Sequence, residues 1–400
     1  MKKNIGQNIG QNEPTSLMEP MLPPVGDRVL EDLAIDLVEK GGGLASRIHP
    51  ITQNGIGDLV RSMNCYYSNL IEGHDTHPRD IEKALAKNFS RQPKQRDLQM
   101  EAKAHIEVQR WVDHGAVPED LTEENYILEI HRRFCERLPE SLLWVEDPDS
   151  KERIKILPGK LRDRTVVVGR HIPPRPAHLA KILARFNEAY RPANLSKLQR
   201  VLAIAASHHR LLWIHPFLDG NGRVTRLLSH AYFKYLGVGN ALWSVSRGLA
   251  RSVSDYKAKL EAADEARQGD LDGRGSLSLS ALRDFCEYFL KTCLDQVTFM
   301  ASLLEPSELM RRIQLYCEDE ERAERLPKKS FMLLREALLV GEFDRGRVGE
   351  ITGYSERQGR RVLSELEGEG LLKSETPKGP VRLAFPVKVV ERWFPRLYPV

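Results

Sequence analysis

The sequence predicts a mainly α-helical protein that ends in a smaller α+β domain. Through most of the first 300 residues, apolar side chains recur at three- and four-residue intervals, which is typical of one face of a helix. The segments with this spacing are 81–86, 98–112, 126–138, 179–190, 198–214 and 282–304. One β-branched run, residues 165–169, interrupts them and precedes Pro173 and Pro174, so we expect a short strand or hairpin there.

A second pattern follows a connecting helix expected at 305–327. Three helices are predicted at 331–340, 348–352 and 355–372. The third is opened by Ser355, and Gln358 three residues later completes a capping box. Residues 371–375 and 381–385 then flank a turn rich in Pro and Gly, which predicts a two-stranded wing. Three helices followed by a hairpin are typical of a winged helix-turn-helix.

Composition and charge restrict the class of protein. The chain has 400 residues, of which 41% are hydrophobic and 29% charged, as in ordinary globular proteins of two or three domains. Its five cysteines form no C-x-x-C pair, which favours a reduced compartment. We expect no signal peptide and no membrane span, and therefore a cytoplasmic protein without a membrane partner. The net charge of +4 is too small to indicate a nucleic-acid partner by itself.

The strongest chemical signal is the segment from His215 to Arg226, which reads His-Pro-Phe-Leu-Asp-Gly-Asn-Gly-Arg-Val-Thr-Arg. Its turn, residues 220–222, precedes a helix expected over 224–235. A glycine-rich turn that opens a helix exposes backbone N–H groups, and these form an anion nest at the positive end of the helix dipole. The segment therefore outlines a phosphate site.

Four side chains around this turn add chemistry. Asp219 offers a carboxylate of the kind that Mg²⁺ accepts while it also holds substrate phosphates. Arg223 and Arg226 are three residues apart, so both project from one helix face toward the same anion. His215, with an ordinary pKa of about 6.5, can take a proton from a hydroxyl nucleophile at neutral pH.

This segment resembles the motif of the Fic (filamentation induced by cAMP) family, H-x-F-x-[D/E]-G-N-G-R-x-x-R, and matches it at every specified position. The resemblance covers roughly residues 30–300 and implies a helical Fic fold with a short β-hairpin flap. It implies a protein adenylyltransferase, which moves AMP from ATP to a Ser, Thr or Tyr hydroxyl of a protein target and releases pyrophosphate. His215 would be the general base, Asp219 would bind Mg²⁺, and Phe217 would pack inward. The residues that would hold ATP and its phosphates are Gly220, Asn221, Gly222, Arg223 and Arg226.

The same resemblance implies two further sites. Val166, Val167, Val168 and Gly169 resemble the family's flap, which docks an extended target segment by strand addition. Tyr256 is a candidate for contact with the adenine of ATP.

A segment nearer the N-terminus resembles the inhibitory helix of one Fic class, whose pattern is [S/T]-x-x-x-E-[G/N]. The segment Ser68-Asn-Leu-Ile-Glu72-Gly73 fits this pattern and lies on the expected side of the core. The resemblance implies that Glu72 pairs with Arg226 and occupies the room of the γ-phosphate, so that ATP binds without correct alignment. We therefore expect an enzyme restrained by Glu72. The alternative is that Glu72 is an ordinary acid at a helix end.

These interpretations divide the chain into consecutive parts: a flexible leader (1–28), an N-terminal helical region with the inhibitory helix (29–110), the Fic catalytic core (111–304), a connecting helix (305–327) and the winged helix (328–400). The last part has fourteen Lys and Arg against ten Asp and Glu. Because Arg357, Arg360 and Arg361 open its candidate recognition helix, DNA is a candidate partner. A winged helix for protein docking or dimerisation, including a homodimer, is the alternative.

Other functions stay open at this point. Glu72 would position water for the removal of AMP from a modified protein, or the Fic domain would sense nucleotide for a DNA-binding regulator. The motif also does not identify the base, so another phosphate-containing group is an alternative cargo. Metal sites elsewhere are not expected. His208 and His209 are adjacent and point apart on a helix, and the segment 270–281 has Arg274 and Ala281 at the fifth and twelfth positions of a calcium loop, where the twelfth should be Glu.

Overall fold

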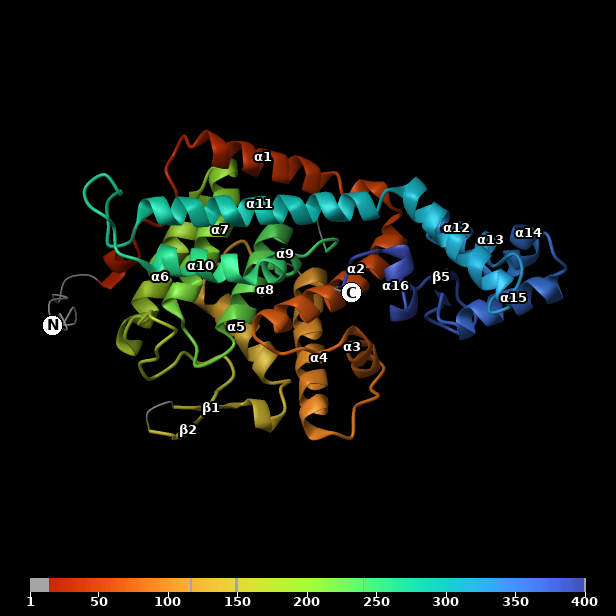
Figure 1. The fold of residues 1–400 in the computed structure, drawn as a ribbon, viewed down its shortest axis with the longest axis horizontal. Coiled ribbons are helices and arrows are strands. Elements are labelled where there is room, and N and C mark those ends of the chain that lie inside the picture. Colours follow the sequence, from red (N-terminus) through yellow and green to blue (C-terminus); the bar gives the residue numbers. More distant parts are fainter. Residues whose placement is uncertain (1–13, 116, 148–149, 240, 399–400) are drawn as a thin grey trace. The chain divides into compact units, whose positions relative to one another are not determined.

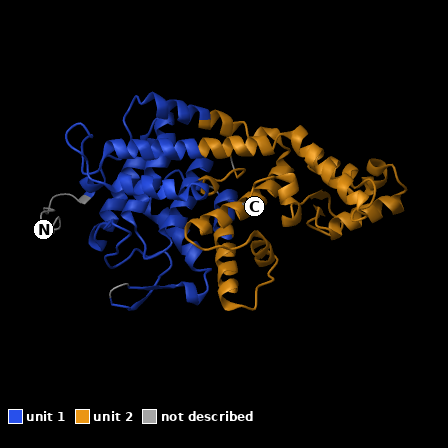
Figure 2. Cartoon of the chain, viewed as in Figure 1, with its two compact units in different colours: residues 1–36, 107–236, 249–292 blue, residues 37–106, 237–248, 293–400 orange. Residues whose placement is uncertain are grey.

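The computed structural model describes residues 14–115, 117–147, 150–239 and 241–398. This part of the chain is mainly helical, as predicted (Figure 1). It forms two compact units, each assembled from segments that are not consecutive in sequence (Figure 2). Unit 1 takes the chain up to Asp36 together with 107–236 and 249–292, and unit 2 takes 37–106, 237–248 and the chain from Cys293 onward. The consecutive domains expected from the sequence stay a prediction.

Unit 1 is a helical bundle with one small sheet. Its complete elements are α5 (Glu124–Cys135), α6 (Leu179–Tyr190), α7 (Lys197–Ile214), α8 (Asn221–Tyr235), α10 (Val253–Asp264), β1 (Trp144–Glu146) and β2 (Arg153–Lys155). Four helices contribute residues to both units: α1 (Arg28–Gly42), α4 (Pro93–His114), α9 (Val245–Arg251) and α11 (Leu279–Leu303). Among the described residues, no helix has both the length and the apolar character that crossing a bilayer requires.

The centre of unit 1 is α7, which packs against α6, α8 and α10. Ser196 caps its N-terminus in a capping box with Gln199, a device that satisfies N–H groups the helix itself cannot. From Val201 to Leu211 every α7 side chain is buried. A helix that is buried on all sides belongs to the interior of a domain, and it can fix the loop that leaves its end.

The strands of unit 1 differ from those expected. The antiparallel pair β1–β2, with Val145 opposite Ile154, was not predicted, because three-residue strands are too short for a periodic signal. The β-branched run 165–169 forms no regular strand; it leads into a tight turn in which Val168 and His171 make an isolated antiparallel bridge. This turn is the part of the expected hairpin that the structure contains.

Part of the segment predicted as a leader, residues 1–28, packs against unit 1. Residues 1–13 lie outside the described part, but Met18 and Met21 are buried in unit 1. The hydroxyl of Tyr190 donates to the Met21 carbonyl (2.6 Å), and Arg210 Nη2 donates to the Pro20 carbonyl (2.8 Å). The composition of this segment is typical of a loop, whereas these contacts come from helices 169 and 190 residues away in the chain. The leader as a domain boundary stays a prediction.

Unit 2 contains the remaining elements. They are α2 (Pro50–Ile71), α3 (Pro78–Leu85), α12 (Pro306–Arg322), α13 (Ser330–Val340), β3 (Glu342–Phe343), α14 (Val348–Thr352), α15 (Glu356–Gly368), β4 (Leu372–Lys373), β5 (Val381–Leu383) and α16 (Val387–Trp393). The three helices predicted beyond residue 330 are present as α13, α14 and α15, and Ser355 and Gln358 form the predicted capping box. β3 was missed, and the antiparallel sheet has the order β3-β5-β4.

The segment after α16 is built into unit 2. Phe394 and Leu397 are fully buried. The Leu397 carbonyl accepts hydrogen bonds from the Tyr67 hydroxyl (3.0 Å) and from Arg247 Nε (3.3 Å), and Arg247 Nη2 donates to the Arg396 carbonyl (2.7 Å). The guanidinium of Arg247 also lies 3.7 Å from the ring centroid of Phe299. One buried arginine thus joins the end of the described chain to α2 and α11.

Candidate active site

The loop between α7 and α8 carries the predicted motif. His215 ends α7 in a left-handed conformation (φ 49°), and Gly220 (φ 83°) precedes α8 in the same region of backbone space. Because α8 begins at Asn221 and not at Val224, Gly222 lies inside the first helical turn and not before it. The first N–H groups of a helix have no acceptor within the helix, so this turn is the anion-binding end of α8.

Asn221 closes this loop from inside. Its Oδ1 accepts the Phe217 N–H (3.0 Å), and its Nδ2 donates to the Phe217 carbonyl (2.9 Å). Phe217 is fully buried, as predicted. The Asn221 amide thus holds the loop, while its backbone N–H lies in the first turn of α8. The predicted part of Asn221 in binding phosphate stays a prediction.

His131 of α5 lies beneath the loop, and the sequence did not single it out. Its ring stacks on that of Phe217 with centroids 3.8 Å apart. Its Nδ1 accepts the Gly159 N–H (3.0 Å), so the neutral ring carries its proton on Nε2, which faces Cys135 Sγ (3.3 Å). Burial lowers the pKa of His131 to about 4. A buried, neutral His131 therefore supports Phe217, and its position on the apolar face of α5 was the only signal for it.

Arg162 holds the loop from the other side and was also missed. It is almost fully buried, and its Nε donates to the His215 carbonyl (2.7 Å). Nη1 donates to the Arg164 carbonyl (2.9 Å) and Nη2 to the Pro174 carbonyl (2.5 Å). A single guanidinium thereby joins the His215 backbone to both ends of the segment that contains the predicted flap. Three carbonyls converge on one planar donor group, which is a geometry that arginine fits and lysine does not.

His215 is in the neutral form at pH 7. Burial, and then the electrostatic effect of Arg162 and His171, lowers the pKa of its imidazole to about 4, while Asp219 acts in the opposite direction. A neutral ring has one nitrogen with a free lone pair, so it can accept a proton. The negative phosphates of a bound nucleotide would raise this pKa and strengthen His215 as a base.

Asp219, Arg223 and Arg226 lie around the N-terminus of α8, where they were predicted. Arg223 Nη2 contacts Asp219 Oδ2 (3.2 Å), and its guanidinium stands 5.0 Å from the Phe134 ring centroid. Arg223 and Arg226 are buried, whereas 48% of the Asp219 side chain is exposed. The site thus pairs two buried cations with one accessible carboxylate at the positive end of a helix, which is an environment that favours a bound polyanion.

Tyr256, the predicted contact for adenine, lies in the core of unit 1. It lies on α10, is only 2% exposed, and its hydroxyl is 2.8 Å from His208 Nε2. His208 Nδ1 is in turn 2.8 Å from Ser229 Oγ, which donates to the Thr225 carbonyl (3.0 Å). This chain of hydrogen bonds joins α10, α7 and α8 and gives Tyr256 a part in their packing. The predicted contact of Tyr256 with adenine stays a prediction.

The predicted flap is an exposed turn next to this loop. Val167 is 67% exposed and Val168 41%, and Gly169 has the positive φ (60°) that the turn requires. His171 Nε2 contacts the Trp213 carbonyl (2.7 Å), two residues before His215. The turn is therefore attached to the end of α7, while its apolar side chains remain accessible.

The predicted inhibitory motif lies at the end of α2 in unit 2. Ser68 is fully buried in this helix, Glu72 follows its last residue, and Gly73 (φ 83°) has the left-handed conformation common after a helix end. The motif therefore has the helical setting that the resemblance implies. Its proposed pairing with Arg226 stays a prediction.

Comparison with known proteins identifies this region. Residues 120–233 match the model of the Fic/DOC family. The chain contains a Fic/DOC family domain. This domain spans α5 to α8 and includes His131, Arg162 and the complete motif.

Curated relatives of the Fic domain are named protein adenylyltransferase Fic. The protein of Drosophila erecta is 38% identical over 111 residues, which are 28% of this chain and 19% of the relative. The protein of Drosophila melanogaster is also 38% identical over 111 residues, 28% of this chain and 20% of the relative. The matched region thus spans about a fifth of the length of these relatives.

Solved structures show the same fold over more of the chain. A Fic family protein from Desulfovibrio desulfuricans G20 has a TM-score of 0.54 at 17% identity, covering 91% of this chain and 98% of the other. A Fic domain containing signaling protein from Bacteroides thetaiotaomicron has a TM-score of 0.50 at 18% identity, covering 69% and 97%. The similarity of fold therefore extends beyond the Fic domain itself.

Proposed function

We propose that this protein transfers AMP from ATP to a hydroxyl side chain of a protein target. The observation that carries the proposal is the loop 215–220, which places a neutral His215 at one end and the N-terminus of α8 at the other, inside a domain whose curated relatives are named adenylyltransferases. A proton acceptor and a polyanion site within one short loop suit attack of a hydroxyl on a phosphate.

Each residue of the loop has a part in this reaction. His215 accepts the proton of the target hydroxyl as its oxygen bonds to the α-phosphorus, and the bond to the leaving pyrophosphate breaks. The N–H groups of Gly220 and Gly222, with Arg223 and Arg226, hold the phosphates and stabilise the charge that develops on them. Asn221 and Phe217 keep the loop in shape, so the acceptor and the phosphate site stay at a fixed separation.

Asp219 is the residue of this site that fits a Mg²⁺ ion. Mg²⁺ is usually held by one or two carboxylates together with substrate phosphates and water. Nearly half of the Asp219 side chain is exposed, and its carboxylate adjoins the phosphate end of α8. The ion, when bound, would supply positive charge between phosphate oxygens. Arg223, which contacts the same carboxylate, would be its neighbour and competitor.

We further propose that Glu72 restrains the enzyme. The support is the position of the motif at the end of a helix whose Ser68 is buried, with Glu72 exposed directly after the last helical residue. A carboxylate that pairs with Arg226 would take the place of the γ-phosphate and leave ATP misaligned.

Incubation with ATP labelled at either the α- or the γ-phosphate tests both proposals. Label should enter protein from α-labelled ATP alone, should increase in Glu72→Gly, and should be absent in His215→Ala. Equal labelling by wild type and Glu72→Gly would remove the proposed restraint. Labelling from γ-labelled ATP, or labelling that survives His215→Ala, would contradict AMP transfer by this loop.

Two alternatives predict different results. If the protein removes AMP, Glu72→Gly should lose the release of label from an AMP-modified protein, because Glu72 would position the water. If another phosphate-containing group is the cargo, label should follow that group and not the adenine of ATP. The proposed location for either reaction is the cytoplasm.

A second candidate function belongs to the C-terminal elements. We infer a winged helix from α13, α14, α15 and the sheet β3-β5-β4, and Arg357, Arg360 and Arg361 are exposed on α15. However, Arg361 Nε pairs with Glu365 (2.8 Å) and Arg360 with Glu356, so part of the positive charge is balanced on the helix itself. Binding of a labelled DNA duplex at low salt, lost when the three arginines are changed to alanine, would favour a DNA-binding regulator. No binding would favour protein docking or dimerisation.

A further inference from the structure

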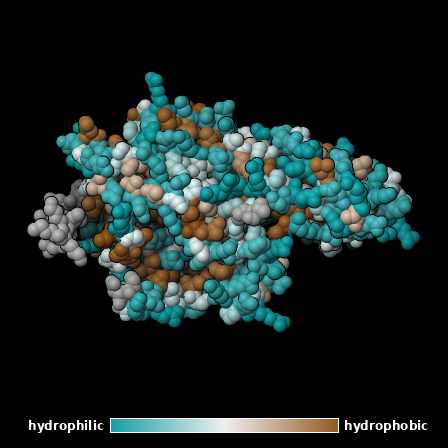
Figure 3. Space-filling model, viewed as in Figure 1, coloured by the Kyte–Doolittle hydropathy of each residue, from teal (hydrophilic) through white to brown (hydrophobic). Residues whose placement is uncertain are grey.

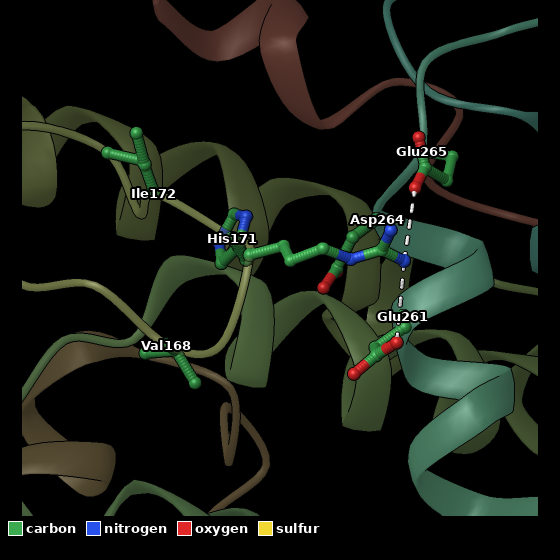
Figure 4. A pocket seen from close by; sticks show the side chains of 7 residues that line it. Val168, His171, Ile172, Glu261, Asp264 and Glu265 are labelled. Atoms are coloured by element: carbon green, nitrogen blue, oxygen red, sulfur yellow. Dashed lines mark ion pairs between the residues drawn. The ribbon is translucent and has the colours of Figure 1, made fainter.

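A cavity of about 280 Å³ lies beside the predicted flap, between the turn 168–172 and the end of α10 (Figure 4). The turn contributes the apolar side chains of Val168 and Ile172, which are 41% and 67% exposed. The surface of unit 1 shows further apolar groups among its hydrophilic ones (Figure 3). The α10 side contributes the carboxylates of Glu261, Asp264 and Glu265. One wall of the cavity is thus apolar and the opposite wall is acidic.

The acidic wall has more negative charge than its own cations balance. Asp264 Oδ1 contacts His209 Nε2 (3.0 Å), but burial lowers the pKa of His209, so this ring is neutral at pH 7. Arg170 Nη2 pairs with Glu261 (3.5 Å) and with Glu265 (3.9 Å). Asp264 also interacts electrostatically with Arg210, so three carboxylates face two guanidiniums and one negative charge is in excess. The negative end of the α10 dipole adds to it.

The contacts of Arg170 indicate what kind of side chain the cavity would bind. Its guanidinium occupies the space between two carboxylates while 80% of its side chain is exposed, so both contacts are long and weakened by solvent. A lysine or arginine from another chain would meet the same carboxylates and would also cover Val168 and Ile172 with its methylene stem. Such a side chain would make the apolar and the ionic contacts at the same time, which Arg170 does not do.

The position of the turn connects this cavity to the reaction. His171 is bonded to the Trp213 carbonyl, and Arg162 joins the His215 carbonyl to the carbonyls of Arg164 and Pro174. Within the described part of the chain, residues 165–167 pair with no strand. An extended segment that adds to this free edge would therefore be held beside His215 and would meet the cavity at the turn.

We propose that this cavity selects target segments with a lysine or arginine close in sequence to the modified hydroxyl. The basic head binds Glu261 and Glu265 in place of Arg170, and the stem lies on Val168 and Ile172. The proposal rests on the proposed docking of an extended target at the flap. It assigns a chemical class to the target segment. The exposed backbone edge alone cannot do so, because hydrogen bonds between backbones depend little on which residues the target contains.

Binding of defined peptides tests the selection without any transfer. The full chain with His215→Ala would be titrated with fluorescent ten-residue peptides of alternating threonine and valine, with lysine, norleucine or glutamate placed at each position in turn. At one or more positions the lysine peptide should bind about three- to ten-fold more tightly than the norleucine peptide, as a few exposed ion pairs allow. The difference should shrink as salt increases.

Variants of the acidic wall give the control. Glu261→Gln with Glu265→Gln should abolish the preference for lysine, and Arg170→Ala should increase it because the internal competitor is gone. The double variant Glu188→Gln with Asp284→Asn is the matched control. It removes the same amount of negative charge from unit 1, but at exposed carboxylates outside the cavity, and should leave the preference for lysine intact.

Either of two results would overturn the selection: equal or no binding of the lysine and norleucine peptides at every position, or a preference that persists when Glu261 and Glu265 are both glutamine. The same peptides with α-labelled ATP and the Glu72→Gly enzyme report on AMP transfer separately. Selective binding without labelling would contradict the proposed transfer and leave the selection in place. Labelling without selectivity for lysine would contradict the selection alone.

Discussion

Replacement of Arg162 by alanine should damage both stability and the reaction. The guanidinium donates hydrogen bonds of 2.9 Å or less to three carbonyls, those of His215, Arg164 and Pro174. A buried carbonyl that loses its donor costs about 1 to 1.5 kcal/mol, so the free energy of unfolding should fall by about 3 to 5 kcal/mol. Arg162→Lys keeps the charge but has one ammonium for three divergent acceptors, so we expect roughly half of that loss.

The assay combines urea unfolding with labelling by α-labelled ATP in the Glu72→Gly background. Labelling should fall for Arg162→Ala even at temperatures where the protein stays folded, because the His215 backbone loses its anchor. Arg164→Ala is the matched control: its side chain makes only exposed contacts of 3.4 Å, so the unfolding free energy should change by less than about 0.5 kcal/mol. Wild-type stability and labelling in Arg162→Ala would refute the idea that this arginine holds the site together.

Three further predictions concern the loop and its surroundings. Because its pKa in the folded protein is about 4, His215 stays deprotonated well below pH 6.5. We therefore expect kcat/KM to keep its neutral-pH value as the pH is lowered past 6.5 and to fall only as the pH approaches 4. A fall in the pH–rate profile centred near pH 6.5 would contradict the burial of this ring. Asn221→Ala leaves the buried N–H and carbonyl of Phe217 without partners, so the free energy of unfolding measured in urea should fall by about 2 to 4 kcal/mol. A free energy of unfolding close to that of the wild type would show that the loop closes without Asn221. Tyr256→Phe removes one hydrogen bond to His208 and should cost about 1 kcal/mol while the KM for ATP stays unchanged; a tenfold higher KM would support the predicted adenine contact.

The sequence was most informative where chemistry and local structure coincide. The motif was recognisable because its residues are consecutive, and Ser355 with Gln358 predicted a capping box because both partners lie within one helical turn. The predicted helix 179–190 coincides with α6, whose buried residues follow the three- and four-residue spacing. These features need no knowledge of the tertiary fold.

The parts that could not be predicted depend on residues far apart in the chain. Arg162 lies 53 residues from His215, and nothing in its local sequence distinguishes it from the exposed Arg164. Met18 lies in a segment that looks like a linker but is buried by helices of unit 1. The hydrogen bond between Tyr256 and His208 joins residues 48 positions apart, so it could not be foreseen from the segment around Tyr256. Burial and hydrogen-bond partners of this kind come only from the folded chain.

The anchoring of Leu397 by Tyr67 and Arg247 has a consequence for how the protein is made. A ribosome releases the chain from the N-terminus onward, so α2 emerges more than 300 residues before the carbonyl that its Tyr67 binds. Unit 2 therefore cannot complete its core until Leu397 has emerged, whereas the Fic motif, which ends at Arg226, leaves the ribosome well before that residue. If Glu72 at the end of α2 restrains the enzyme, the nascent chain carries its reactive loop before the helix that controls it is secured. The activity of the protein would then be controlled during its synthesis as well as by ligand binding.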